Sequence, residues 1–288
     1  MTYPAKGYGP YGPDPWHQTS WDARAAGNFV CGGAGAGLVV FAVFAGMGSA
    51  VVPWLLLSGL ALVGLGLFSV SLELGRPLRA PNVIRNPRTS WMAREAWVAG
   101  LLFASGFAAA FGVAGMARVA AVLALTFVYC QSRLLQGAKG IPAWREPLLV
   151  PLVLVTGLVE GGGLFVASIP LHRTATPALL TLFAALVVVR MGVWLVYRRR
   201  LTRAAAGARA ALDHAGLILL TLGTAVPLAC VAALVTIALP AGAMAALCVL
   251  AGLAAAGAGA WAKFVLVTRA GFNQGFALPH FPVRGVPR

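Results

Sequence analysis

Charged residues are scarce in this sequence. Only 10% of the 288 residues are charged and 7 are acidic, whereas 60% are hydrophobic. A soluble domain carries about 25% charged residues, so the chain lacks the surface that it would need in water. The composition excludes a soluble enzyme, a disordered chain and a fibrous repeat, and it leaves too few carboxylates for a multi-carboxylate metal site. We therefore predict an integral membrane protein.

Cysteine is also rare, and its spacing does not indicate a metal site. Cys31, Cys130, Cys230 and Cys248 all lie within or beside apolar runs, with no CxxC or Cys/His pattern. We interpret them as small apolar packing residues. Residues 1–23 lack the apolar core of a secretory signal.

Eight apolar runs are long enough to cross a bilayer as helices, which takes about 20 residues at a rise of about 1.5 Å each. The runs are Ala25–Met47, Val51–Leu72, Glu95–Ala114, Val119–Leu134, Leu148–Ile169, Pro177–Tyr197, Ala215–Ala238 and Ala241–Val267. They are too long and too uniformly apolar for barrel strands. We predict an all-α, polytopic membrane bundle of eight transmembrane helices at 24–267, between an extended N-terminal tail at 1–23 and a C-terminal docking tail at 268–288.

Basic residues are distributed very unequally between the two sides of this predicted bundle. Twenty of the 22 Lys and Arg residues fall in the even-numbered connections, the tails and the adjoining helix segments, against Arg118 and Arg173 on the other side. The positive-inside rule then places both termini in the cytoplasm. Membrane orientation explains the net charge of +15 without nucleic-acid binding.

Polar residues of the first four predicted helices gather near the same cytoplasmic boundary. They are Asn28, Glu73, Arg76, Arg94, Glu95, Tyr129, Gln131 and Arg133. Ionisable groups at membrane depth are costly and indicate function by default, so Glu73 and Glu95 are candidate catalytic residues for proton exchange. The alternative is that these groups are helix-end ion pairs and snorkelling arginines.

Three segments, AGNFVCGGAGAG, LELGRPLRAPNVIRNPRTSWMAREA and VYCQSRLLQGAKGIPAW, resemble the membrane-anchor subunits of molybdopterin oxidoreductase complexes. The likeness is to the dimethyl sulfoxide reductase and polysulfide reductase type. The first and last segments most resemble anchors assigned to the phenylacetyl-CoA:acceptor oxidoreductase subgroup. The likeness implies a multi-pass protein of a prokaryotic cytoplasmic membrane. It also implies an anchor that binds ubiquinone or menaquinone and exchanges electrons with an iron–sulfur ferredoxin-like subunit, which serves a molybdenum or tungsten pterin subunit.

The resemblance also implies which residues form the quinone site. Glu73 stands where the dimethyl sulfoxide reductase anchors have a histidine before an L-G-x-P-x-R motif, and Glu95 matches a glutamate early in the third helix. Asn28 and Tyr129 resemble quinone-contacting residues. Gly32 joins these as a small residue of the apolar pocket wall, and Arg76 as a polar residue at the same helix mouth. The candidate quinone-binding set is Asn28, Gly32, Glu73, Arg76, Glu95, Tyr129, Arg133 and Trp144.

Histidine positions do not favour haem, which usually needs two facing histidines on helices. His17 and His280 lie in the tails, His172 in a connection and His214 at a helix mouth, so we predict no haem and no metal ligands. Glu160, near the middle of the fifth predicted helix, is either part of a proton path or, as we favour, a neutral hydrogen-bonded carboxyl. A small-molecule or ion transporter and a purely structural anchor remain as alternative functions.

Overall fold

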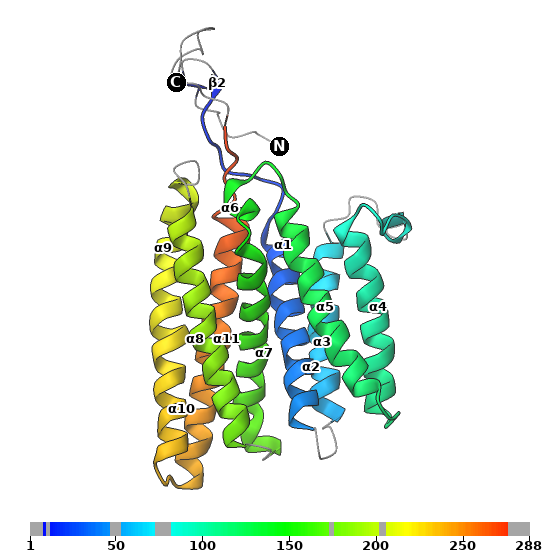
Figure 1. The fold of residues 1–288 in the computed structure, drawn as a ribbon, viewed down its shortest axis with the longest axis vertical. Coiled ribbons are helices and arrows are strands. Elements are labelled where there is room, and N and C mark those ends of the chain that lie inside the picture. Colours follow the sequence, from blue (N-terminus) through cyan, green and yellow to red (C-terminus); the bar gives the residue numbers. More distant parts are fainter. Residues whose placement is uncertain are drawn as a thin grey trace.

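The computed structural model is a bundle of long helices that stand side by side (Figure 1). It describes residues 8–9, 12–46, 53–72, 82–172, 176–201 and 206–275. The elements are β1 (Tyr8–Gly9), β2 (Gly12–Pro13), α1 (Ala23–Gly27), the π-helical turn η1 (Asn28–Gly32), α2 (Gly33–Ala45), α3 (Pro53–Ser71), α4 (Trp91–Ala110), α5 (Met116–Gln136), α6 (Pro142–Arg145), α7 (Leu149–His172), α8 (Pro177–Arg200), α9 (Ala206–Leu220), the π-helical turn η4 (Thr221–Ala225), α10 (Val226–Thr236) and α11 (Ala241–Thr268).

The all-α membrane bundle predicted from the sequence is confirmed. Within the described residues, seven continuous helical segments are long and apolar enough to cross a membrane by length and composition. They are Ala23–Ala45, Pro53–Ser71, Met116–Gln136, Leu149–His172, Pro177–Arg200, Ala206–Thr236 and Ala241–Thr268. The remaining predicted span corresponds to α4, which packs against α3 and α5 but carries Arg94 and Glu95 near its start.

Two predicted helix starts were wrong by four or more residues. The third helix begins at Trp91, four residues before the predicted Glu95, because the side chain of Ser90 caps it by accepting a hydrogen bond from the Ala93 amide. The seventh begins at Ala206 instead of Ala215. Its first turns are amphipathic: Ala208 and Leu212 are buried while Arg209 and Asp213 are exposed, so an apolarity criterion misses them.

Glycines let α2, α7 and α11 approach one another closely at the centre of the bundle. A methyl group at Gly161 of α7 would collide with the backbone of Gly37 and Leu38 in α2. One at Gly163 would lie 2.5 Å from the carbonyl oxygen of Gly252 in α11. Small residues at helix crossings are the usual means of tight association in lipid. These contacts place α7 between the N-terminal and C-terminal parts of the bundle.

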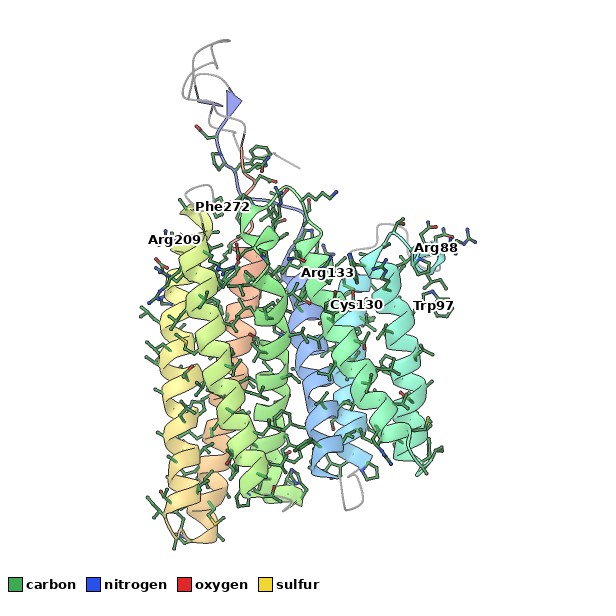
Figure 2. All side chains as sticks on the ribbon, in the orientation of Figure 1. Arg88, Trp97, Cys130, Arg133, Arg209 and Phe272 are labelled. Carbon is green, nitrogen blue, oxygen red and sulfur yellow. The ribbon has the colours of Figure 1, made fainter. Side chains whose placement is uncertain are left out.

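The described segments next to both termini leave the bundle at the same end, which we call the tail end (Figure 1). There the two segments pair: the amide of Gln18 donates to Gly271 O at 2.8 Å, and that of Asn273 to Trp16 O at 2.9 Å. The connection between α5 and α6 joins them through a bond from Gln274 N to Gly140 O at 3.2 Å. Figure 2 places Arg88, Arg209 and Phe272 at this end.

Two basic residues that the sequence assigns to the cytoplasmic side lie inside the bundle. The side chains of Arg190 in α8 and Lys263 in α11 are 0% and 3% exposed. They therefore do not add to the exposed positive charge of the tail end, and their partners lie within the protein.

Candidate functional site

A buried polar cluster joins three helices just inside the tail end. Glu95 of α4 is 3% exposed, and its Oε1 accepts a hydrogen bond from Asn28 Nδ2 at 3.0 Å. Gln131 of α5 donates from Nε2 to the carbonyl oxygen of Asn28 at 2.9 Å. We call Asn28, Glu95 and Gln131 the Glu95 cluster. The structure thus brings together two of the predicted site residues, from helices far apart in the sequence.

The Glu95 cluster keeps unused hydrogen-bonding capacity. Asn28 Oδ1 and Gln131 Oε1 are buried and make no hydrogen bond within the part of the chain that the structure describes. A buried acceptor without a donor costs free energy, so such atoms indicate a place where a further group can bind. Among the described residues, no Lys, Arg or His side chain forms an ion pair with Glu95, whose hydrogen-bond partner is the side-chain amide of Asn28.

An aromatic and cationic edge lies beside this cluster on α4 and α5. The guanidinium carbons of Arg94 and Arg133 stand 4.2 and 4.9 Å from the ring centroid of Trp91. Tyr129 meets the same ring edge-on, with centroids 5.8 Å apart, and is 38% exposed on the outer surface. Arg133 Nε is buried and makes no hydrogen bond to the described residues. Figure 2 shows Arg133 near the tail end.

The other predicted site residues have different surroundings. Gly32 gives space to the Glu95 cluster, because a methyl group there would lie 2.5 Å from Gln131 Nε2 and 3.0 Å from the Phe127 ring. Trp144, on α6, contacts the Trp21 ring at 5.1 Å and donates its indole N–H to Leu266 O at 3.0 Å. Glu73 and Arg76 lie outside the described residues.

Sequence reasoning did not include Gln131 or Trp91 among the binding residues. Gln131 was visible as a polar side chain in an apolar helix, and that signal could have identified it. Trp91 had no comparable signal, since an aromatic residue at a helix end is typical of membrane interfaces in general.

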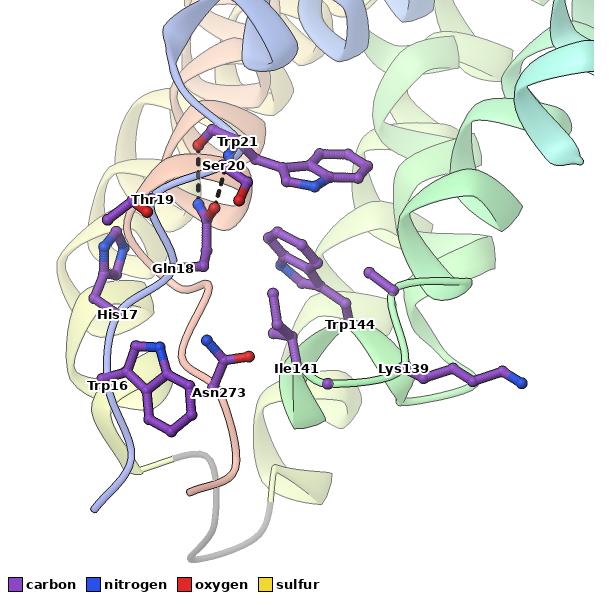
Figure 3. Close-up of a pocket in the computed structure, with 12 residues that line it drawn as sticks. Trp16, His17, Gln18, Thr19, Ser20, Trp21, Lys139, Ile141, Trp144 and Asn273 are labelled. Carbon is purple, nitrogen blue, oxygen red and sulfur yellow. Dashed lines mark hydrogen bonds between the residues drawn. The ribbon is translucent and has the colours of Figure 1, made fainter. Parts of the chain in front are cut away.

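A cavity of about 430 Å³ opens at the tail end, between the paired chain segments and the connection from α5 to α6 (Figure 3). Its aromatic walls are Trp16, Trp21 and Trp144, and His17, Lys139 and Asn273 supply polar groups. The side chain of Gln18 fixes one wall, since its Oε1 accepts from Trp21 N at 2.7 Å and its Nε2 donates to Trp21 O at 2.9 Å. This cavity lies outside the helical core.

A second buried charged group lies deeper in the bundle. Glu160 of α7 is 1% exposed, and its Oε2 is 2.5 Å from Lys263 Nζ of α11. The sequence favours a neutral, hydrogen-bonded Glu160, whereas the structure places it in an ion pair. The interpretation differed because Lys263 was assigned to a helix end on the cytoplasmic side.

Metal-binding features are absent from the part of the chain that the structure describes. That part contains no group of three or more His, Cys, Asp or Glu residues that could hold a metal ion, and all four cysteines are free. His17 packs against the Phe272 ring at 5.2 Å, and a nitrogen of His172 lies 3.1 Å from Ser168 Oγ. The prediction that the chain binds no haem stays a prediction.

A family model described as "DMSO reductase anchor subunit (DmsC)" matches residues 27–256. The match includes the whole Glu95 cluster and the aromatic edge, together with Glu160 and Arg190. No curated protein matches the chain significantly.

Proposed function

The chain belongs to the DMSO reductase anchor subunit family, and from this premise we propose that it binds a quinone at the Glu95 cluster and the adjacent aromatic edge. It is a membrane anchor subunit of a molybdoenzyme complex. In this proposal it passes electrons between a docked iron–sulfur subunit and the membrane quinone pool. The quinone in this proposal is ubiquinone or menaquinone.

The observation that carries the proposal is a buried carboxyl held by an amide at the tail end. Reduction of a quinone takes up two electrons and two protons, so a quinone site needs a group that can exchange protons. Glu95 can hold or release a proton without losing a cationic partner, because its hydrogen bond comes from Asn28 Nδ2 at 3.0 Å. The unused acceptors Asn28 Oδ1 and Gln131 Oε1 provide places for a hydroxyl donor beside that carboxyl.

The aromatic edge has the composition expected of a headgroup site that opens toward lipid. Tyr129 and Arg133 supply hydrogen-bond donors, and the Trp91 ring supplies an apolar face. Tyr129 is 38% exposed on the bundle surface, where a lipid-soluble molecule could reach it laterally. A few polar groups within mostly apolar walls are the general pattern of small-molecule sites.

We place the partner subunits at the tail end and, by the positive-inside rule, in the cytoplasm. The cavity walled by Trp16, Trp21 and Trp144 opens at this end, together with exposed basic residues such as Arg145, Arg200 and Arg269. Aromatic residues and arginine are enriched in protein interfaces. This is the same end as the Glu95 cluster, which keeps the electron path short.

The test is Glu95→Gln in the intact complex, with Asp213→Asn as the control. Asp213 is a carboxylate outside the proposed site, and its Oδ1 forms an exposed ion pair with Arg198 at 2.5 Å. We expect Glu95→Gln to lower quinone-linked turnover about 100-fold, because a positioned proton exchanger contributes about that factor or more. Turnover with an artificial dye that bypasses the anchor should be unchanged, as should both activities of Asp213→Asn.

Unchanged quinone turnover in Glu95→Gln would contradict the site assignment and would favour a purely structural anchor. Composition of the gently purified complex provides a second check. Iron, molybdenum or tungsten, and an extractable quinone should accompany the chain. A preparation that lacks all of them but moves a solute across vesicle membranes would favour the transporter alternative.

A further inference from the structure

Three charged side chains from the C-terminal part of the bundle meet in its interior, away from the proposed quinone site. They are Glu160 of α7, Arg190 of α8 and Lys263 of α11, and each is at most 3% exposed. The Glu160 carboxylate and the Lys263 ammonium are 2.5 Å apart. We call these residues the Glu160 cluster. The quinone chemistry proposed above uses none of them.

Glycines on neighbouring helices leave the space that this cluster occupies. A methyl group at Gly33 would collide with Lys263 Nζ. At Gly259 it would lie 3.1 Å from both Glu160 Oε1 and Arg190 Nη1, which shows that these two groups face the same point of α11. At Gly223 it would lie 2.9 Å from Arg190 Nη2. The backbone is thus shaped around the charged groups.

Both cations bind backbone carbonyl groups in the two π-helical turns of the chain's described part. Lys263 Nζ donates to Phe29 O in η1, and Arg190 Nη2 donates to Gly223 O in η4. Arg190 Nη1 also donates to Ala255 O at 3.0 Å. A carbonyl oxygen has two lone pairs, so it can accept a side-chain donor besides its helical bond. Single π turns inside helices are often found at functional sites.

The Phe29 carbonyl connects the Glu160 cluster to the Glu95 cluster. Phe29 directly follows Asn28, whose carbonyl accepts from Gln131 of α5 and whose side chain donates to Glu95 of α4. The η1 turn is therefore held from α4, α5 and α11. Of these contacts, only the one from Lys263 comes from the C-terminal part of the bundle.

We propose that Lys263 is a positioning residue for the quinone site. Its bond to Phe29 O fixes the η1 turn, and the turn directs the Asn28 side chain at Glu95. This inference rests on the proposed function. Arg190 makes the equivalent contact with η4, and its hydrogen bonds to the described residues go to Gly223 and Ala255, neither of which lies in η1. It therefore provides a matched control.

The experiment uses three double variants that share Glu160→Gln, so that no carboxylate is left buried without its cation. Glu160→Gln/Lys263→Met removes the donor to Phe29 O, and Glu160→Gln/Lys263→Gln restores an uncharged donor. Glu160→Gln/Arg190→Met removes the corresponding donor from η4. All are prepared as the assembled complex, and quinone KM, quinone kcat and dye-linked turnover are measured for each.

We expect Glu160→Gln/Lys263→Met to raise the quinone KM about tenfold, the size expected for one lost hydrogen bond from a charged donor. The quinone kcat and dye-linked turnover should stay within about twofold of the values for Glu160→Gln/Lys263→Gln. The other two variants should have a KM within about threefold of the unmodified complex. A near-normal quinone KM in both the Lys263→Gln and the Arg190→Met doubles would support positioning by the Lys263 donor.

Equal KM values in the Lys263→Met and Arg190→Met doubles, or a KM unchanged in both, would overturn the inference. If the Lys263→Met double does not assemble, Gly33→Ala replaces it, because the methyl group of the alanine would displace Lys263 Nζ. An unchanged quinone KM in Gly33→Ala would also overturn the inference. The Glu95→Gln variant separates the two proposals. If Glu95→Gln keeps full quinone turnover, the proposed function fails. If Glu95→Gln loses turnover but the quinone KM is unchanged in Glu160→Gln/Lys263→Met, only this inference fails.

Discussion

Glu95 and Glu160 are both glutamates buried within long helices, but their carboxyl groups have different partners. Glu95 is 3% exposed and takes its hydrogen bond from the amide of Asn28. Glu160 is 1% exposed and lies against Lys263, with Arg190 facing the same glycine. An amide partner tolerates either protonation state of a carboxyl, whereas an ammonium partner favours the charged one. The first arrangement suits proton exchange and the second suits a fixed charge.

The same substitution at both positions should therefore have very different effects on stability. Glu160→Gln leaves Lys263 and Arg190 buried without their counter-charge, and breaking a buried pair in this way costs about 3–5 kcal/mol. Glu95→Gln should cost about 1 kcal/mol or less, because glutamine can still accept from Asn28. Thermal unfolding of each purified variant in detergent measures both values. Equal losses would show that the two carboxyls have the same kind of environment.

A second comparison uses two glycines of α11 that lie two residues apart. A methyl group at Gly259 would contact the Glu160 Cγ at 2.9 Å, whereas a methyl group at Gly257 would meet no atom within 4 Å. We expect Gly259→Ala to destabilise the bundle by about 1–3 kcal/mol through overpacking. Gly257→Ala should be neutral or slightly stabilising, since alanine favours a helix.

Unfolding midpoints of the two alanine variants in one detergent provide the measurement. If both variants were neutral, the Glu160 cluster would have room to move, and the fixed-charge interpretation would lose its packing support. Quinone-linked turnover of the Gly257→Ala complex should equal that of the unmodified complex.

The smallest effect is expected at the exposed ion pair between Arg198 and Asp213, 2.5 Å apart at the tail end. Asp213→Asn should change stability by about 0.5 kcal/mol or less, because surface pairs are solvated and screened. The difference from unmodified protein should vanish at high salt. A loss as large as that of Glu160→Gln would mean that Asp213 is buried by a partner in the measured sample.

Much of the Glu95 cluster could be predicted from the sequence. Helices that start and end at the same boundary bring Asn28 and Glu95 to one level, and polar residues in apolar helices are conspicuous there. The family resemblance pointed to the same residues. The sequence did not indicate that Gln131 would bind the backbone of Asn28, because this contact depends on how α5 is rotated against η1.

The Glu160 cluster could not be predicted in the same way. The predicted helix, Ala241–Val267, ends one residue before the observed α11, but the positive-inside count assigned Lys263 to the cytoplasmic end of that helix, whereas the structure buries its side chain. Which helix faces Glu160 depends on glycine contacts between α2, α7 and α11, which join residues about 90 or more positions apart. A single sequence shows the glycines but not which of them meet.

The η1 turn also sets the angular phase of everything that precedes it. A π-helical turn amounts to one residue inserted into an α-helix, and one residue corresponds to a rotation of about 100°. Without the insertion, Trp21 would turn away from the Trp144 ring of α6, which it now contacts at 5.1 Å. Deleting Val30 should therefore rotate the N-terminal segment around the helix axis, while the membrane-embedded part of α2 keeps its place.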